Sequence, residues 1–417
     1  MGIGMMLHRM ARPRPPSPSF RRTVEATVSP LKGHFPISFY VPKDYNARKR
    51  LKGKRFPCVI NFHGGGFVLG TAQDDARWCD LVCKEVGAVV ASVDYRLAPE
   101  FPFPTAVEDG ADAILYLAKH ADELHLDAEQ FAVSGFSSGG NMSFTVPLCL
   151  QGELLDKAVK SILTGTTPTP IPGNAPLNPK APNLAIPTPN TTNPNTPNGS
   201  RIKLTRQTSR LDRIAALRQT GTSTLSLISS TKSHDGAVAV LAANTLVKIR
   251  GIVSFYPSTD YTQTRAQRRQ TCSRTDQQLP AVFTELFDDS YLQPPSLDLA
   301  HPWLSPGVAP DSMLELLPDD IVLVTCEWDM LLAEGERLRD RLMKELGKRV
   351  KYHCVPGVPH GWDKAPNPWR ESPGARDQYR VAAGELRRMF GVGFEEEEWE
   401  EGAVGEQVGP QITVDEV

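Results

Sequence analysis

The sequence predicts an α/β protein built on a mostly parallel sheet with helices on its faces. Two observations lead to this prediction. Short apolar runs typical of buried strands recur along the chain, and helix-compatible stretches separate the later runs. Consecutive strands can lie parallel when a helix connects them. The chain has 417 residues, of which 40% are hydrophobic, and this is enough for a large core.

Eight segments are predicted as strands. The first two alternate apolar and polar residues like an opening antiparallel pair, and the later ones are short and apolar. In order, the segments are residues 23–29, 36–41, 58–62, 88–93, 131–134, 251–255, 321–326 and 350–354. A helix is predicted over 105–120, with Glu108, Asp109 and Asp112 on its polar face.

A serine follows the fifth predicted strand in the pattern G-x-S-x-G. In the string GFSSGG, Ser137 stands between Gly135 and Gly139. A side chain at either glycine would clash where strand and helix meet, and the strained turn lifts the serine oxygen out of the sheet. The pattern therefore predicts that Ser137 is a nucleophile.

Three glycines follow the third predicted strand. The run 58–62 leads into His63 and then Gly64, Gly65 and Gly66. Side-chain-free backbone exposes consecutive N–H groups, which a carbonyl needs as preorganised donors when it becomes tetrahedral and negatively charged. A plain glycine turn is the alternative, but the downstream serine turn favours the donor interpretation and contributes a further N–H from Ser138.

A base and an orienting acid follow in the order that a serine nucleophile requires. Asp329 comes after the segment 321–326 and precedes a helix that begins near Ala333. In that helix, Glu334 is expected to stabilise the first turn through its interaction with the helix dipole. His360 lies in the loop PGVPHGW after 350–354. It is the one histidine of nine that follows the last strand on a turn, which completes the order Ser, Asp, His.

Taken together, these blocks resemble the hormone-sensitive-lipase-like branch of the α/β-hydrolases, the fold-3 esterases. The resemblance covers about 55–150 and 249–390 and rests on HGGGF, VDYRLAPEFPFPTAVED (93–109), GFSSGGN, AHPWLSP (300–306), EWDMLLAEG (327–335) and HGW. It implies an α/β-hydrolase fold with an eight-stranded, mostly parallel sheet and a helical cap. It also implies a triad of Ser137, Asp329 and His360, and an oxyanion hole from Gly65, Gly66 and Ser138. The surrounding motif residues His63, Gly64, Gly135 and Gly139 are expected to support these groups.

The chain departs from the family pattern near the nucleophile. The family usually has G-D-S-A-G-G, whereas here Phe136 and Ser138 replace the acid and the alanine, and Ala333 replaces a second acid after Asp329. Losing the carboxylate at Phe136 removes a polar contact near the turn. The donor at Ser138 is a backbone N–H, so it survives the change.

The expected activity is that of a serine esterase that cleaves small or medium hydrophobic carboxylic esters through an acyl-enzyme, with no metal or organic cofactor. The same triad would also serve an amide or formamide hydrolase. A small-ligand receptor on a hydrolase scaffold is the third hypothesis, and it is disfavoured because such receptors lose the base whereas His360 is present. Homodimerisation and the identity of the acyl and alcohol groups stay open.

Charge and composition exclude other classes. A net charge of -2 gives no general attraction to nucleic acid, and no run reaches the length of about 18 apolar residues that a membrane span requires. Cys79 and Cys83 are interpreted as thiols rather than metal ligands, because no matching Cys/His pair is near. We expect a cytoplasmic protein. Mitochondrial targeting is the alternative, since the Arg- and Pro-rich start has no acid before Glu25.

The domain prediction divides the chain into five regions. Two parts of one hydrolase domain, 23–165 and 246–393, are separated by a low-complexity insertion at 166–245, and the second part includes the cap segment 258–305. A disordered basic arm at 1–22 and an acidic disordered tail at 394–417 flank them. The insertion is rich in Pro, Asn and Thr and cannot offset its ordering entropy; a retained intron is the alternative explanation.

Overall fold

The fold is a single eight-stranded sheet covered by helices on both faces. The computed structural model describes residues 8–48, 55–164, 247–364, 367 and 369–392. The strand order is β1-β2-β4-β3-β5-β6-β7-β8, with β1 and β2 antiparallel to their neighbours and all later pairs parallel. The predicted fold class is therefore confirmed.

Every predicted strand overlaps an observed one. The observed strands are β1 Phe20–Glu25, β2 His34–Tyr40, β3 Phe56–Phe62, β4 Val89–Val93, β5 Leu126–Phe136, β6 Ile249–Phe255, β7 Asp320–Trp328 and β8 Arg349–Pro359. Only the first is clearly displaced. Phe20 pairs with Phe39 and stacks on its ring at 4.6 Å, so the strand starts before residue 23. It ends at Glu25 because the N–H groups of Thr27 and Val28 bond to Asp112 instead of the sheet.

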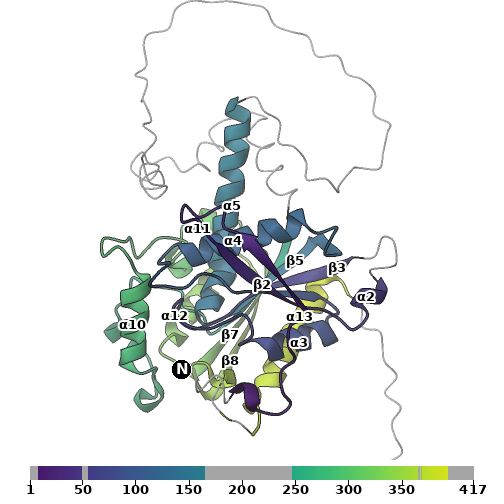
Figure 1. Cartoon of the computed structure of the whole chain (residues 1–417). Helices are drawn as coiled ribbons and strands as arrows, with labels where there is room; N and C mark the ends of the chain where they lie inside the picture. Colours follow the sequence, from purple (N-terminus) through teal and green to yellow (C-terminus); the bar gives the residue numbers. More distant parts are fainter. Residues whose placement is uncertain (1–7, 49–54, 165–246, 365–366, 368, 393–417) are drawn as a thin grey trace, which may run out of the picture.

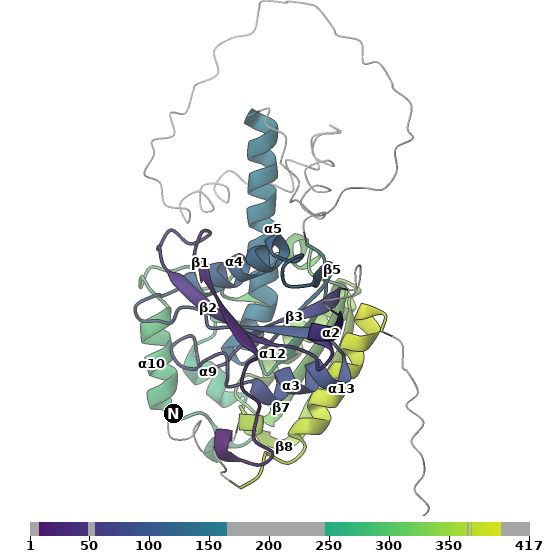
Figure 2. The ribbon, with the colours of Figure 1, turned by 45° about the vertical axis from the view of Figure 1, so that its right-hand side comes forward.

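The helices form two layers. α3 (Ala76–Glu85) and α13 (Ala375–Phe390) pack together on one face, and α4 (Thr105–Lys119) and α5 (Ser138–Thr164) cover the other (Figures 1 and 2). Alternate residues of β3 serve the two cores, as the pleat requires: Ile60 lies in the α4–α5 cluster and Val59 in the α3–α13 cluster.

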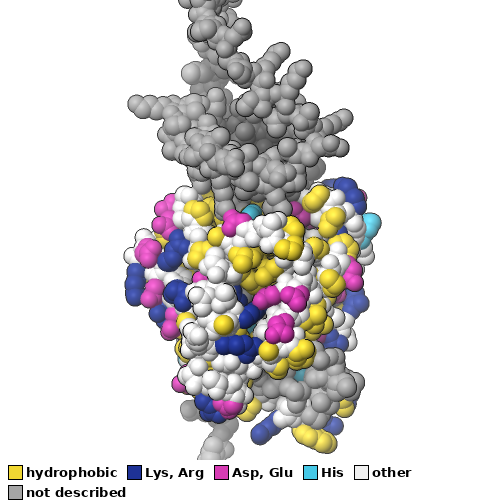
Figure 3. Space-filling model, turned by 90° about the vertical axis from the view of Figure 1, so that its left-hand side faces the viewer, with side chains coloured by type: hydrophobic (Ala, Val, Ile, Leu, Met, Phe, Trp, Pro, Cys, Tyr) yellow, Lys and Arg dark blue, Asp and Glu magenta, His cyan; other side chains and the backbone are white. Residues whose placement is uncertain are grey.

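The remaining helices are short or lie at the carboxyl ends of the strands. They are α2 Tyr45–Arg48, α9 Arg265–Gln270, η1 Thr275–Gln277, α10 Ala281–Tyr291, η2 Pro306–Val308, α11 Asp311–Leu314, α12 Leu332–Asp340, η3 Arg341–Glu345 and η4 Trp362–Lys364. The predicted cap segment 258–305 contains α9, η1 and α10. Figure 3 looks onto the face that carries α10, where apolar, basic and acidic side chains are interspersed and neither sign of charge dominates.

The acids of α4 do not form a polar surface, so that prediction is wrong. Glu108, Asp109 and Asp112 are all buried. Asp109 pairs with Arg96, with 2.6 Å between Oδ1 and the guanidinium, and Asp112 accepts from two backbone N–H groups at 2.8 Å. The physical reason is that α4 contacts β1, β5 and α5, so its polar side faces other parts of the chain rather than water.

Residues 8–22, which we expected in a disordered arm, lie against the domain instead. His8 and Ala11 are buried, and the Arg77 guanidinium donates to their carbonyl oxygens at 3.0 and 2.9 Å. Arg9 pairs with Asp74 at 2.5 Å. A basic, Pro-rich composition did not reveal these contacts, because the partners, Arg77 of α3 and Asp74 just before it, lie in another part of the chain. The predicted insertion at 166–245 and the tail at 394–417 lie outside the described residues.

Candidate active site

The serine turn joins β5 to α5 at the centre of the sheet. Ser137 has φ +55°, a left-handed backbone conformation that is strained for a residue with a side chain. Its N–H donates to Phe255 O at 2.9 Å. A Cβ on Gly135 would stand 2.0 Å from Gly139 O, and one on Gly139 would stand 2.0 Å from Phe62 O. Both glycines are therefore required by close backbone contacts, as the sequence predicted.

A hydrogen-bonded chain connects the three residues that the sequence singled out. Ser137 Oγ lies 2.8 Å from His360 Nε2, and His360 Nδ1 lies 2.7 Å from Asp329 Oδ2. Because a carboxylate oxygen accepts, Nδ1 carries the proton and the lone pair of Nε2 faces the serine hydroxyl. The other oxygen of Asp329 accepts from Leu331 N at 3.0 Å, which fixes the carboxyl group.

These side chains come from loops at the carboxyl ends of three parallel strands. Asp329 directly follows β7 and its side chain is 1% exposed; His360 directly follows β8 and its side chain is 9% exposed. The rings of Tyr256 and His360 meet edge to face with centroids 4.9 Å apart. This packing restricts the imidazole in the orientation that reaches both partners.

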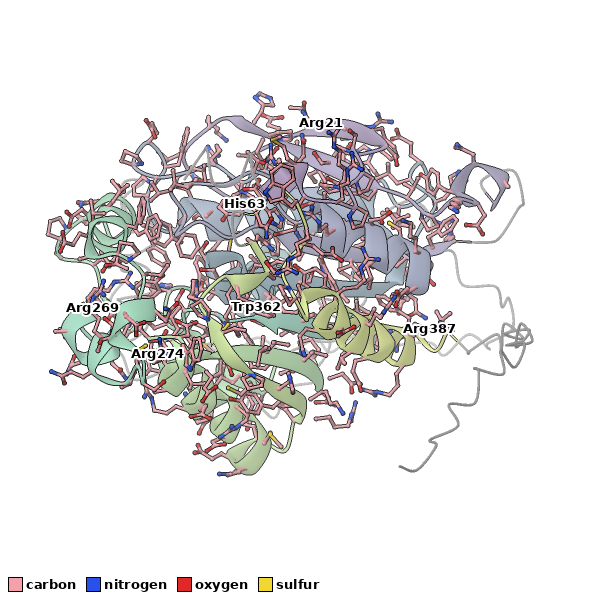
Figure 4. All side chains as sticks on the ribbon, turned by 90° about the horizontal axis from the view of Figure 1, so that it is seen from below. Arg21, His63, Arg269, Arg274, Trp362 and Arg387 are labelled. Atoms are coloured by element: carbon pink, nitrogen blue, oxygen red, sulfur yellow. The ribbon has the colours of Figure 1, made fainter. Side chains whose placement is uncertain are left out.

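The glycine loop packs directly against the serine turn. His63 is buried, its Nδ1 lies 2.8 Å from Gly64 O, and Tyr95 OH donates to its carbonyl oxygen at 2.7 Å. A Cβ on Gly64 would be 3.0 Å from Phe136 O. Figure 4 shows His63 and Trp362 near the middle of the molecule, with Arg269 and Arg274 of the cap segment to one side.

Gly65 and Gly66 adopt conformations that other residues rarely adopt. Their φ values are +122° and +64°. A Cβ would lie 2.1 Å from Leu69 O at Gly65 and 2.3 Å from the Phe287 ring at Gly66. Gly66 lines the same cavity as Ser137, Ser138 and His360, whereas Gly65 does not line it.

The cavity beside Ser137 is narrow, with a volume of about 30 Å³. Much of its wall comes from the segment 258–305, which sequence reasoning did not resolve into individual residues. A helical spacing was the available signal: Thr284, Phe287, Asp288 and Tyr291 lie on one face of α10 and all line the cavity. The other wall residues are Phe67, Ser258, Tyr261, Arg265, Leu279 and Leu331.

Glu334 lies in the first turn of α12, as the sequence suggested, and has further contacts that the sequence did not reveal. It is buried, and its Oε1 accepts from Thr259 N at 2.6 Å and Asp260 N at 3.3 Å. Its Oε2 lies 3.0 Å from Arg268 Nε of α9. Burial raises the pKa of Glu334 to about 7, against the opposing influence of Arg268 and the two N–H groups. Glu334 thus connects the helix after Asp329 to the cap segment.

The departure at Phe136 is accommodated by an aromatic cluster. Phe136 is buried and stacks on Phe255 with centroids 4.4 Å apart, while Trp78 and Tyr379 meet it edge-on. An apolar residue is therefore packed at this position, although the family pattern has an acid there.

Within the described part of the chain, no group of three or more His, Cys, Asp or Glu side chains is arranged to hold a metal ion. Cys79 and Cys83 are buried free thiols. Among the same residues, no helix combines the length and apolar character needed to cross a membrane.

Comparison with known proteins gives one family and several relatives. A family model described as alpha/beta hydrolase fold matches residues 59–211 and 235–364. An AB hydrolase superfamily protein of Schizosaccharomyces pombe is 44% identical over 88 residues, which are 21% of this chain and 26% of that protein. Human hormone-sensitive lipase is 41% identical over 90 residues, 22% of this chain and 8% of the lipase. The matched segments thus span only a small part of these curated relatives.

Solved structures share this fold. EstE1, described as a thermophilic and thermostable carboxylesterase cloned from a metagenomic library, superposes with a TM-score of 0.57 at 25% identity. The match covers 93% of this chain and 94% of that one.

Proposed function

Because the chain belongs to the α/β-hydrolase fold family, in its hormone-sensitive-lipase-like branch, we propose that it is a serine hydrolase of carboxylic esters. The observation that carries this proposal is the hydrogen-bonded chain from Ser137 through His360 to Asp329 at the carboxyl ends of the parallel strands. A nucleophile, a base and an acid that orients the base are the parts that acyl transfer needs.

The first half of the proposed reaction acylates the serine. Ser137 Oγ attacks the carbonyl carbon of the ester while its proton moves to His360 Nε2, and the carbonyl π electrons move onto oxygen. The N–H groups of Gly66 and Ser138, two residues that line the cavity, donate to this oxyanion, and Gly65, which lies just outside the lining, is the third proposed donor. The oxyanion then re-forms the carbonyl, the carbon–oxygen bond to the alcohol breaks, and His360 returns the proton to the departing alcohol.

The second half hydrolyses the acyl-enzyme. Water takes the place of the alcohol: His360 accepts its proton, its oxygen attacks the acyl carbon, and Ser137 leaves with the proton that His360 returns. The products are the carboxylic acid and free enzyme. Throughout, Asp329 holds the Nδ1–H tautomer and stabilises the imidazolium that forms in each half.

Small and medium hydrophobic esters are the proposed substrates, as the family resemblance implies. Phe67, Phe287 and Tyr291 give apolar walls beside Ser137, and the cavity volume is only about 30 Å³. We therefore expect turnover to fall as the acyl chain becomes longer.

A fluorophosphonate probe tests the nucleophile. The wild-type protein should be labelled, Ser137→Ala should take no label, and Ser138→Ala should keep most of the labelling because only its backbone N–H is used. Labelling that persists in Ser137→Ala would contradict the assignment. A panel of p-nitrophenyl esters of graded chain length, with a p-nitroanilide of matching acyl group, then separates ester from amide hydrolysis.

A further inference from the structure

A buried lysine lies directly behind the proposed triad. Lys364 ends η4, the short turn after His360, and its side chain is 13% exposed. Its ammonium lies 2.9 Å from an oxygen of Asp75 and 2.9 Å from an oxygen of Asp363. Burial alone lowers the pKa of the Lys364 ammonium, but Asp363 and Asp75 raise it above its ordinary value. The lysine is therefore a cation at neutral pH.

The same ammonium lies over the ring of Phe136. Its distance to the ring centroid is 3.6 Å, and Phe136 is 1% exposed, so water does not weaken the attraction between the cation and the aromatic face. Phe136 immediately precedes Ser137. It is also the residue that stands where the G-D-S-A-G-G pattern has its acid, so here an aromatic face lies beside the cation.

The two carboxylates extend these contacts to the other walls of the site. Asp75 accepts from Asn61 Nδ2 at 2.8 Å, and Asn61 lies on β3 just before the glycine loop. Asp363 accepts from Tyr256 OH at 2.5 Å, and the Tyr256 ring packs against the His360 ring. We call Lys364, Asp75, Asp363, Phe136 and Tyr256 the Lys364 cluster. Its members come from four separate segments of the chain.

Stability alone is a poor explanation for this cluster. Taking one ammonium and two carboxylates out of water costs nearly as much as their attraction returns, and replacing all three together by well-packed apolar side chains of similar volume is often neutral or stabilising. The ammonium has something an apolar chain lacks, namely a positive charge that attracts Asp75, Asp363 and the face of Phe136 at the same time and so favours fixed distances between the segments that carry them. Those elements carry Ser137 and His360, whose reacting atoms are 2.8 Å apart.

We propose that Lys364 is a positioning residue, which holds the Ser137 turn through Phe136 and the His360 loop through Asp363 at their mutual hydrogen-bonding distance. The proposal rests on the proposed serine hydrolase function. Because misplacing a reacting group by about 1 Å can reduce a rate by about 10²-fold, small movements of either loop have a large effect on turnover.

Lys364→Met tests the proposal, with Lys348→Met as the matched control. Lys348 is also buried, with a side chain 5% exposed, and its ammonium contacts Glu315 O at 2.8 Å, Leu317 O at 2.6 Å and Asp319 at 3.3 Å. It precedes β8, at the opposite end of that strand from His360. For each folded variant we would measure the urea midpoint, kcat and KM for a short p-nitrophenyl ester, and the rate of fluorophosphonate labelling.

Both variants should lose stability, but only Lys364→Met should lose turnover. We expect its kcat and its labelling rate to fall by about 10-fold to 10²-fold while KM changes by less than about threefold, because orientation of the reacting groups and not substrate binding is lost. Lys364→Arg should recover part of this rate, since a guanidinium keeps the charge and stacks on an aromatic face.

Equal kcat in Lys364→Met, Lys348→Met and the wild-type protein would overturn the proposal. If Lys364→Met does not fold, Phe136→Leu decides, because it keeps every charge and removes the aromatic face under the ammonium together with the stacking on Phe255. It should lower kcat several-fold with KM unchanged, and a folded Phe136→Leu variant with wild-type kcat would refute the role. A wild-type protein that neither takes label nor cleaves esters would overturn the proposed function, and this inference with it.

Discussion

Glu334→Gln should remove a pH dependence from the stability of this protein. In the folded state the Glu334 carboxyl has a pKa of about 7, compared with an ordinary value of 4.5, mainly because it is fully buried. Between these two pH values the folded protein therefore keeps a proton that the unfolded chain has lost. Stability from this group is fully present below pH 4.5 and is lost as the pH rises through 7.

The size of the effect follows from the two pKa values. Each unit corresponds to about 1.4 kcal/mol, so the free energy of unfolding should fall by about 3 kcal/mol in total through Glu334 as pH rises across this range. Glutamine keeps an oxygen to accept from Thr259 N and Asp260 N, but its amide group cannot titrate. It leaves Arg268 without a counter-charge, and this cost is the same at every pH because arginine stays protonated.

The assay is urea denaturation of both proteins at several pH values from 5 to 8. The wild-type free energy of unfolding minus that of Glu334→Gln should decrease steadily as pH rises. Glu336→Gln is the control, since Glu336 lies on the same helix with a side chain 43% exposed and should show almost no such trend. A difference that stays flat or increases with pH would show that Arg268, and not burial, determines the pKa of Glu334.

Two further predictions concern the proposed site. Asp329→Asn should reduce kcat by about 10⁴-fold because the imidazole loses its preferred tautomer, with little change in melting temperature; a loss below tenfold in the folded variant would mean that another acid orients His360. Gly66→Ala should reduce stability and turnover more than Gly87→Ala does, although both glycines have positive φ values, +64° and +69°. Each incurs about 1 kcal/mol of backbone strain, but a Cβ on Gly66 would also meet Phe287 at 2.3 Å whereas one on Gly87 meets nothing within 4 Å. Thermal melting and ester turnover check this, and equal losses would contradict it.

Local patterns were sufficient for the framework of the fold and for the choice of candidate residues. Apolar runs located the strands, because a strand buried on both faces needs apolar residues at every position. The glycines around Ser137 were readable because close backbone approach excludes any side chain there, at 2.0 Å for Gly135 and Gly139. The order Ser137, Asp329, His360 could be read from the strands they follow, and the structure brings these three into hydrogen-bonding contact. Their catalytic roles stay predictions for the labelling and turnover experiments.

The burial of charged groups could not be predicted in the same way. Asp109 and Asp112 looked like a solvated helix face, and Glu334 like a residue that favours a helix start. Each is buried because donors from another segment satisfy it: Arg96 for Asp109, the backbone of residues 27–28 for Asp112, and the backbone N–H groups of residues 259–260 for Glu334. A pattern within one helix contains no information about a partner that another part of the chain supplies.

The sequence by itself therefore determined the sheet, the serine turn and the residues that follow each strand, since these depend on neighbours close in the chain. Only the tertiary structure decided how the site is enclosed and supported. Phe287 closes over Gly66 from the cap segment, Arg77 holds residues 8–11 against α3, and Lys364 joins Asp75 to Phe136. These contacts join segments far apart in sequence, and their geometry exists only once the sheet has brought those segments together.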